Sequence, residues 1–140
     1  MQDRFAGDVG DFGKYGLLRH LCTGKAREKN LSLGVVWYLV PDENHNSAGK
    51  HTSYLVKEFG FRECDRILFD ALKGFKDDFE RGGERSVRKI QSLKIFPSRT
   101  VFHDQVLTFE NTPSDGRKAI EFRLEIRRNW VERALRATKG

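Results

Sequence analysis

Apolar residues recur at helical spacing along several segments of the chain. Phe12, Tyr15, Leu18 and Cys22 follow one another at intervals of three or four residues, which predicts a first helix over residues 11–22 with Asp11 as its N-cap. Two glycines inside this segment weaken helix formation, so the helix is expected to begin near Tyr15. Further helices are predicted over residues 52–59, 65–73 and 86–92, with an exposed charged segment at residues 76–83.

Two other segments have the character of strands. Residues 34–40 form a continuous run of β-branched and aromatic residues ended by Pro41, which is typical of a strand buried on both faces. Residues 100–107 follow Pro97 and alternate between apolar and polar residues, which predicts a second strand. Helices that alternate with apolar strands indicate one α/β domain over residues 1–140, a Rossmann-like layered domain with a mostly parallel sheet flanked by helices.

The last third of the chain fits two periodicities. Residues 120–126 alternate as a strand would, yet on a helical projection Ile120, Leu124, Val131 and Leu135 fall on one face. The longer pattern favours a helix, and we predict a long C-terminal helix capped by Ser114 or Asp115.

Charge is distributed unevenly between the two halves. The net charge is +6, and residues 1–70 hold ten Lys and Arg against ten Asp and Glu, whereas residues 71–140 hold sixteen against ten. A basic half is expected of a protein that meets polyanions, because phosphate neutralisation releases counterions. Solvated helix faces rich in Lys and Arg give the same composition, so nucleic acid is one candidate partner of the second half.

Composition also bounds the class of protein. The longest apolar run, residues 35–40, is too short to span a bilayer, and the first eight residues have no apolar signal core, so a cytoplasmic protein without membrane contact is expected. Cys22 and Cys64 lie far apart without metal-ligand spacing, and we expect two small buried thiols.

The amino-terminal segment contains four glycines at a strict spacing of three, interleaved with Asp8, Asp11 and Lys14. It does not match a P-loop, because Asp8 stands where the first Gly is needed and Tyr15 where the hydroxyl residue is needed. Asp8 and Asp11 are candidate ligands of a divalent metal, and Lys14 is a candidate substrate-binding residue. The alternative is a Gly-rich turn in which aspartates only cap backbone groups.

The loop after the first predicted strand carries the densest set of reactive side chains. In an α/β sheet such a loop opens into the ligand crevice. Asp42 or Glu43 could act as a base or metal ligand, His45 as an acid or ligand, and Lys50 as an anion clamp. A solvated polar loop is the competing interpretation, since exposure alone favours the same residues.

Arg123 and Arg127 project into the apolar arc of the predicted C-terminal helix. They could bind an anionic ligand or pair with Asp8, Asp11 or Asp42, because guanidinium groups suit bidentate partners. Alternatively, their apolar stems are buried and their head groups reach the rim. His20 and His103 are interpreted as structural histidines.

Two stretches resemble a family of uncharacterised bacterial and phage-associated proteins. The first is RFAGDVGDFGKYGLLR (residues 4–19), and the second is WYLVPDE (residues 37–43) followed by His45, Asn46, residues 49–51 and residues 54–55. Arg128, Trp130, Ala134 and Leu135 look like a later helix of that family. The resemblance implies an intracellular protein without a settled activity. Family members continue into another apolar strand, so the resemblance also implies that this chain is a truncated copy, incomplete at its C-terminal end.

The layout is also similar to Rossmann-type methyltransferases, which implies S-adenosylmethionine as one candidate cofactor beside a divalent metal. Where those enzymes carry a Gly-rich turn after the first strand, residues 41–45 read PDENH.

Two functions from different classes follow from the sequence. The first is an enzyme-like domain of nucleic-acid processing or modification, resembling a methyltransferase or a metal-dependent nuclease, with Asp8, Asp11, Asp42, Glu43 and His45 at a polar cleft. The second is a non-catalytic basic module that binds nucleic acid or a protein through the basic second half, including Lys76, Arg85, Arg88 and Lys89. The substrate, reaction and oligomeric state are left open.

Overall fold

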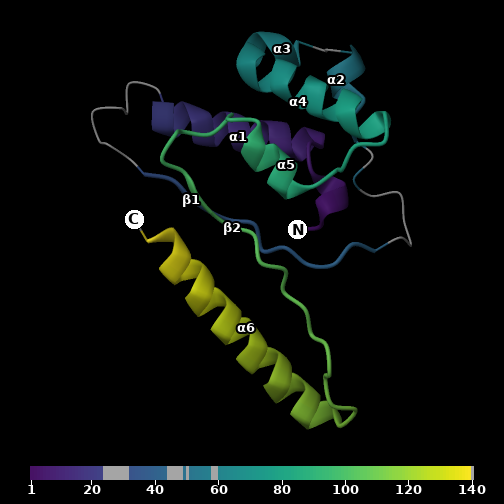
Figure 1. Ribbon diagram of the computed structural model, residues 1–140, viewed down its shortest axis with the longest axis vertical. Helices are drawn as coiled ribbons and strands as arrows, with labels where there is room; N and C mark the ends of the chain where they lie inside the picture. Colours follow the sequence, from purple (N-terminus) through teal and green to yellow (C-terminus); the bar gives the residue numbers. More distant parts are fainter. Residues whose placement is uncertain (24–31, 44–48, 50, 58–59, 140) are drawn as a thin grey trace.

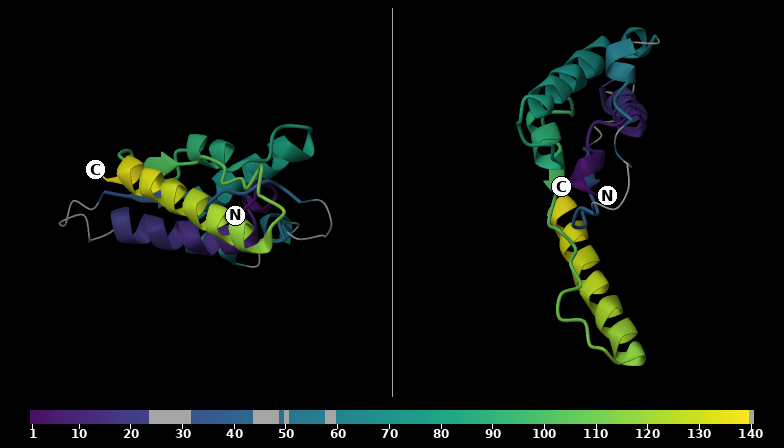
Figure 2. Two further views of the ribbon diagram at one scale, coloured as in Figure 1. Left: turned by 90° about the horizontal axis from the view of Figure 1, so that it is seen from below. Right: turned by 90° about the vertical axis from the view of Figure 1, so that its right-hand side faces the viewer.

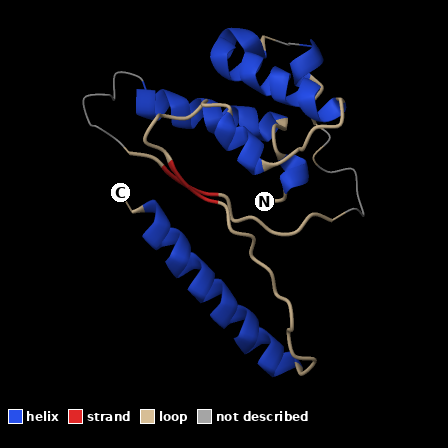
Figure 3. Ribbon diagram, viewed as in Figure 1, coloured by secondary structure: helices blue, strands red, loops and turns tan. Residues whose placement is uncertain are grey.

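The computed structural model describes residues 1–23, 32–43, 49, 51–57 and 60–139. Over these residues the fold is mixed α/β, with two parallel strands and helices on both sides of them (Figure 1, Figure 3). The elements are, in order, the 3-10 helix η1 (Asp3–Phe5), α1 (Val9–Thr23), β1 (Gly34–Val36), α2 (Tyr54–Lys57), α3 (Phe61–Cys64), α4 (Arg66–Glu80), α5 (Val87–Ser92), β2 (Val101–His103) and α6 (Gly116–Thr138).

The strand pair separates two unequal groups of helices. Helices α1 to α5 lie together on one side, with α4 in contact with α1, α2, α3 and α5 (Figure 1). Helix α6 lies on the other side, where its C-terminal half packs against β1 and β2. Its N-terminal half extends away from the other helices, with the segment that joins β2 to α6 running beside it (Figure 2).

The strands are shorter than the sequence indicates. Strand β1 occupies only the first three residues of the predicted run 34–40, and its residues alternate between exposed and half-buried, so the prediction of burial on both faces was wrong. Tyr38 adopts a φ of 47°, a left-handed backbone that ends regular pairing just after Trp37. The apolar run still supplies core residues, since Trp37 and Leu39 are buried.

Strand β2 is likewise shorter than the predicted strand 100–107. Val35 pairs with Phe102 and Val36 with His103 in parallel register. The two segments that follow the strands stay side by side, since Leu107 N donates a hydrogen bond to Leu39 O over 2.7 Å. Both segments that follow the strands therefore leave the sheet from the same edge.

Helix α4 differs from two of the predictions. The glycine at position 74 was expected to end this helix, but α4 continues to Glu80, because Phe75 and Lys76 are buried against the body of the protein. Lys76 forms an ion pair with Glu80, so the segment 76–83 is not uniformly exposed as expected. Packing of an amphipathic face here outweighs the low helix propensity of glycine.

The other helices keep closer to the sequence pattern. Helix α1 begins at Val9, earlier than the expected start near Tyr15, because Asp8 Oδ1 accepts a hydrogen bond from Asp11 N over 3.0 Å and caps the first turn. Ser86 caps α5 as predicted. Asp115 caps α6, accepting from two backbone N–H groups. Of the predicted helix 52–59, α2 covers residues 54–57, and residues 58–59 lie outside the described part of the chain.

The main core is aromatic and lies between the strands and the five smaller helices. Phe12, Tyr15, Trp37, Phe69 and Phe96 are buried there, and their rings meet mostly edge to face. A second, smaller cluster joins α6 to the segment after β2.

Three smaller predictions have mixed outcomes. Cys64 is exposed and Cys22 is half-buried, so the expectation of two buried thiols was wrong. His103 is buried against Trp130, whereas His20 is exposed. Over the described residues, no helix combines the length and apolar character that crossing a bilayer requires.

Candidate functional site

A pocket of about 550 Å³ opens at the carboxyl ends of the two parallel strands. One wall comes from the segment after β1 and the other from the segment after β2. The lining residues are Val40, Pro41, Asp42 and Glu43 on one side and Leu107, Thr108, Phe109 and Glu110 on the other. Ligands of parallel α/β sheets bind at this edge, so the pocket is the leading candidate site.

The amino terminus holds the first wall in place. The Met1 ammonium group donates to Tyr38 O over 2.7 Å, and Val40 N donates to Met1 O over 2.8 Å. Gln2 Nε2 then donates to Pro41 O over 2.9 Å. The first two residues thus run beside the segment that leads from β1 to the pocket and fix its path.

Arg4 positions the two predicted catalytic carboxylates. Arg4 N donates to Asp42 Oδ1 over 3.3 Å, and the Arg4 guanidinium lies 3.9 Å from Glu43 Oε2. The guanidinium also donates to Gln2 Oε1 over 2.6 Å. Asp42 and Glu43 are both exposed, and both line the pocket.

Helix α6 supports the second wall. Leu107 packs with Trp130 and Ala134, and Val40 and Phe109 lie against this cluster. Trp130 Nε1 donates to Gln105 O over 2.9 Å, which fixes the chain between β2 and the pocket. The position of the second wall therefore depends on the packing of α6.

Among the predicted substrate-binding residues that the structure describes, Arg127 contacts the pocket lining. Its guanidinium lies 5.8 Å from the centre of the Phe109 ring, which lines the second wall. Arg123 is exposed on the same helix. Among the described residues neither arginine pairs with an aspartate, so the predicted pairing with Asp8, Asp11 or Asp42 is not seen.

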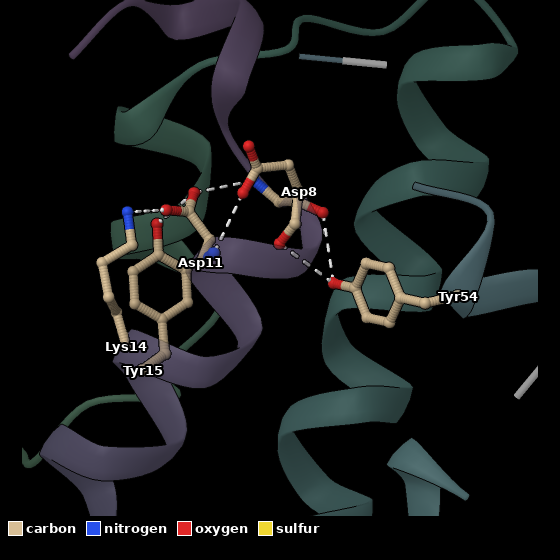
Figure 4. A network of polar contacts seen from close by, with 6 residues as sticks. Asp8, Asp11, Lys14, Tyr15 and Tyr54 are labelled. Atoms are coloured by element: carbon tan, nitrogen blue, oxygen red, sulfur yellow. Dashed lines mark hydrogen bonds and ion pairs between the residues drawn. The ribbon is translucent and has the colours of Figure 1, made fainter. Parts of the chain in front are cut away.

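A second polar cluster lies at the start of α1 (Figure 4). The buried carboxylate of Asp11 accepts hydrogen bonds from Gly7 N over 3.0 Å and from Tyr15 Oη over 2.8 Å, and Lys14 Nζ lies 2.7 Å from its other oxygen. Tyr54 Oη donates to Gly7 O over 3.2 Å. These contacts tie α1 to the turn that precedes it and to α2.

The tyrosines of this cluster are held in their neutral form. Burial raises the pKa of Tyr15 well above its ordinary value, and the negative charge and hydrogen bond of Asp11 raise it further. Burial also raises the pKa of Tyr54, again with the charges of Asp11 and Asp8 adding to the effect. Both hydroxyls act as hydrogen-bond donors, and neither is poised to act as a base.

Arg85 lies within electrostatic range of Asp8 and Asp11 in the α1 cluster and of Asp42 at the pocket. Burial lowers the pKa of its guanidinium, while the charges of Asp8, Asp11 and Asp42 act in the opposite direction. Its Nε donates to Ala6 O over 2.9 Å, and its Nη2 is buried without a hydrogen-bond partner in the described part of the chain. The sequence placed Arg85 on a basic surface, but in the structure it is half-buried, with its guanidinium over the Phe79 ring.

The predicted site residues therefore fall into two groups. Asp42 and Glu43 line the pocket and Arg127 lies beside it, whereas Asp8, Asp11 and Lys14 belong to the α1 cluster. The predictions for His45 and Lys50 concern positions outside the described residues. Among the described residues, no three His, Cys, Asp or Glu side chains lie close enough to hold a metal ion together.

Two pocket residues were missed by the sequence reasoning. Phe109 and Glu110 follow β2 as Asp42 and Glu43 follow β1, and the rule about carboxyl ends of parallel strands applies equally to both. The polar residues after the second apolar run were the signal that could have identified them.

Comparison of the chain with protein-family models, with curated proteins and with solved structures gave no match.

Proposed function

We propose that this chain is a nucleic-acid-processing α/β domain with a Rossmann-like arrangement, in which the pocket at the carboxyl ends of β1 and β2 holds the reacting phosphodiester. Asp42 and Glu43 are the central acidic residues of this site, and Glu110 faces them from the second wall. The arginines of α6 hold the nucleic-acid backbone. Hydrolysis assisted by a divalent cation is the reaction class that this arrangement favours.

One observation carries the proposal. The two carboxylates expected at the end of the first strand line a pocket at the shared carboxyl edge of a parallel pair. A merely solvated loop would have no reason to face a second wall that carries a further carboxylate, Glu110. The position of the pocket and the residue types that line it therefore both favour a ligand-binding site at this edge.

The donor set fits a hard divalent cation such as Mg²⁺. Mg²⁺ usually keeps several waters and binds through one or two carboxylates together with substrate phosphates, so a complete protein cage is not needed. Asp42 and Glu43 would hold the ion, with Glu110 available to bind it or one of its waters. When bound, such an ion polarises a phosphoryl oxygen and lowers the pKa of a coordinated water.

The cations of α6 supply the complementary charge. The helix holds seven Lys and Arg against three Glu, and Arg127 stacks over the pocket residue Phe109. Carboxylates alone would repel a phosphodiester, whereas a neighbouring basic helix attracts its backbone. The pocket and the helix together suit a polyanion that must bring one phosphate to an acidic centre.

The test compares two double variants of equal charge. Asp42→Asn/Glu43→Gln removes the two carboxylates of the first pocket wall, and Glu63→Gln/Glu84→Gln removes two exposed carboxylates elsewhere. With Mn²⁺ or Mg²⁺ and labelled single- and double-stranded oligonucleotides, we expect the pocket variant to lose cleavage on the order of a hundredfold or more. The control variant should stay within about twofold of the parent protein, and circular dichroism should show all three proteins folded.

Two results would contradict the proposal. Equal cleavage by the parent and the pocket variant would remove Asp42 and Glu43 from the chemistry. Salt-dependent binding of oligonucleotides without cleavage, unchanged in the pocket variant, would instead support the non-catalytic basic module.

A further inference from the structure

Helix α6 carries a row of exposed apolar side chains that the proposed function does not use. Ile120, Leu124, Val131 and Leu135 are exposed by 61%, 51%, 37% and 54%, respectively. They are spaced four, seven and four residues apart, so they lie on one side of the helix and form what we call the α6 stripe.

The stripe is distinct from the face by which α6 packs on the strands. Trp130 and Ala134 are the buried residues of this helix. At 100° per residue, the centre of the stripe lies about 90° around the helix from this pair. Contiguous exposed apolar surface rimmed by polar residues is typical of a protein interaction site.

Arginines flank the stripe along both edges. On the helical projection Arg117 and Arg128 lie along one edge, with Glu121 next to Arg128. Arg127 lies along the other edge, and Arg123 lies further round on that side. Among the described residues, Arg117, Arg123 and Arg128 make no ion pair. The helix has a net charge of +4 from its seven Lys and Arg and three Glu.

This charge pattern argues against a second copy of the chain as the occupant. The stripe is symmetric about the midpoint between Arg127 and Arg128, so an antiparallel pairing of two stripes brings these arginines against those of the other copy. A parallel pairing places every arginine beside its equivalent. Like charges brought together at a desolvated interface oppose association.

We propose that the α6 stripe is a docking site for an acidic amphipathic helix of another protein. From Ile120 to Leu135 the stripe extends about 22 Å at 1.5 Å per residue, a length that a partner helix of four turns would match. The partner presents apolar residues at helical spacing to the stripe and carboxylates to the arginine edges. Nucleic acid would engage the arginines but would leave the apolar row exposed.

The test uses three designed probes with the full-length chain. The first is a labelled 18-residue helical peptide with leucines at helical spacing and glutamates along both edges. The second has the same leucines with lysines in place of the glutamates, and the third is a vesicle of phosphatidylserine and phosphatidylcholine. Fluorescence anisotropy measures peptide binding, and co-sedimentation measures vesicle binding.

The variants distinguish binding at the α6 stripe from general electrostatic attraction between the peptide and the protein. Leu124→Gln/Val131→Gln removes two exposed apolar side chains, and glutamine is a good helix former at both positions. Arg128→Glu reverses a charge at the stripe edge, and Arg133→Glu reverses one on the opposite side of the helix, so the two single variants have equal net charge. All four positions are exposed, and circular dichroism checks that each variant is folded.

We expect the acidic peptide to bind at least tenfold more tightly than the basic one. Binding should weaken at least tenfold in Leu124→Gln/Val131→Gln and in Arg128→Glu, and change less than threefold in Arg133→Glu. Equal effects of the two charge reversals would overturn the proposal, because they would indicate general attraction of an anion. Vesicle binding that depends on the stripe, or a dimer of the parent chain that the stripe variant abolishes, would assign the stripe to a membrane surface or to a second copy instead.

Discussion

Asp11 illustrates how a residue suited to metal binding can instead be used to hold the fold. Its side chain is 1% exposed, and its two oxygens accept hydrogen bonds from Gly7 N and Tyr15 Oη and pair with Lys14. Removing one of these partners leaves the buried carboxylate with an unsatisfied oxygen, at a cost of about 1–3 kcal/mol in the free energy of unfolding. The spacing of Asp8 and Asp11 suggested metal ligands, but it cannot show that Tyr15 and Lys14 satisfy Asp11.

This cluster predicts a specific dependence of stability on alkaline pH. The pKa of Tyr15 is raised in the folded protein, so the unfolded chain releases this proton near pH 10 while the folded protein keeps it. The contribution of Tyr15 to stability is therefore complete below pH 10 and is lost as pH rises above it, by up to about 1.4 kcal/mol per pH unit. Tyr15→Phe should be less stable than the parent at pH 8, and this difference should shrink by pH 11.

Urea unfolding at pH 8, 10 and 11 measures both proteins under equal conditions. Other groups that titrate in this range affect both proteins alike, so the difference between the two curves isolates Tyr15. Parallel curves would show that Tyr15 ionises as readily in the folded chain as in the unfolded one.

At the scale of elements, local signals predicted helices better than strands. Ser86 was correctly expected to cap α5, because a hydroxyl followed by an amphipathic turn is a local pattern. The end of β1 could not be predicted, since the left-handed backbone of Tyr38 has no sequence signature in an aromatic residue. The continuation of α4 past its internal glycine depends on packing of Phe75, which the local sequence does not show.

Trp130 is the larger of the two buried residues by which α6 docks. Its ring packs on Tyr38 and His103 at centroid distances of 5.0 and 4.9 Å, and its Nε1 donates to Gln105 O. Trp130→Ala should destabilise the fold by about 3–5 kcal/mol, because a large buried side chain is replaced by a cavity. Trp130→Phe keeps most of the packing and loses the hydrogen bond, at a cost of about 1 kcal/mol.

Thermal and urea unfolding check these two values. An exposed apolar residue of the same helix provides the control, and Leu124→Ala should change stability by less than about 0.5 kcal/mol. An equal loss in Leu124→Ala and Trp130→Ala would mean that α6 docks through a different face.

At the scale of the whole molecule, the sequence placed Asp42 and Glu43 at the end of the first strand, where the structure has a pocket, but it did not reveal the second wall of that pocket. The apolar run ending at Pro41 placed Asp42 and Glu43 at a carboxyl edge, and the structure gives that edge a pocket. Glu110 lines the same pocket because β2 lies parallel to β1, a non-local pairing that residue spacing does not reveal. The basic second half was visible from composition, whereas the separation of α6 into a docked face and an exposed stripe required the fold.

The most direct measurement is paramagnetic line broadening by Mn²⁺ in the amide spectrum of the labelled chain. Substoichiometric Mn²⁺, added with and without a 12-nucleotide oligonucleotide, broadens the amide signals nearest to the bound ion. We expect residues 42–43 and 108–110 to broaden first, more strongly with the oligonucleotide present, and the effect to vanish in Asp42→Asn/Glu43→Gln. Broadening centred on the exposed carboxylates of α4, or unchanged in that variant, would show that the pocket between the strand ends is not where the ion and the phosphate meet.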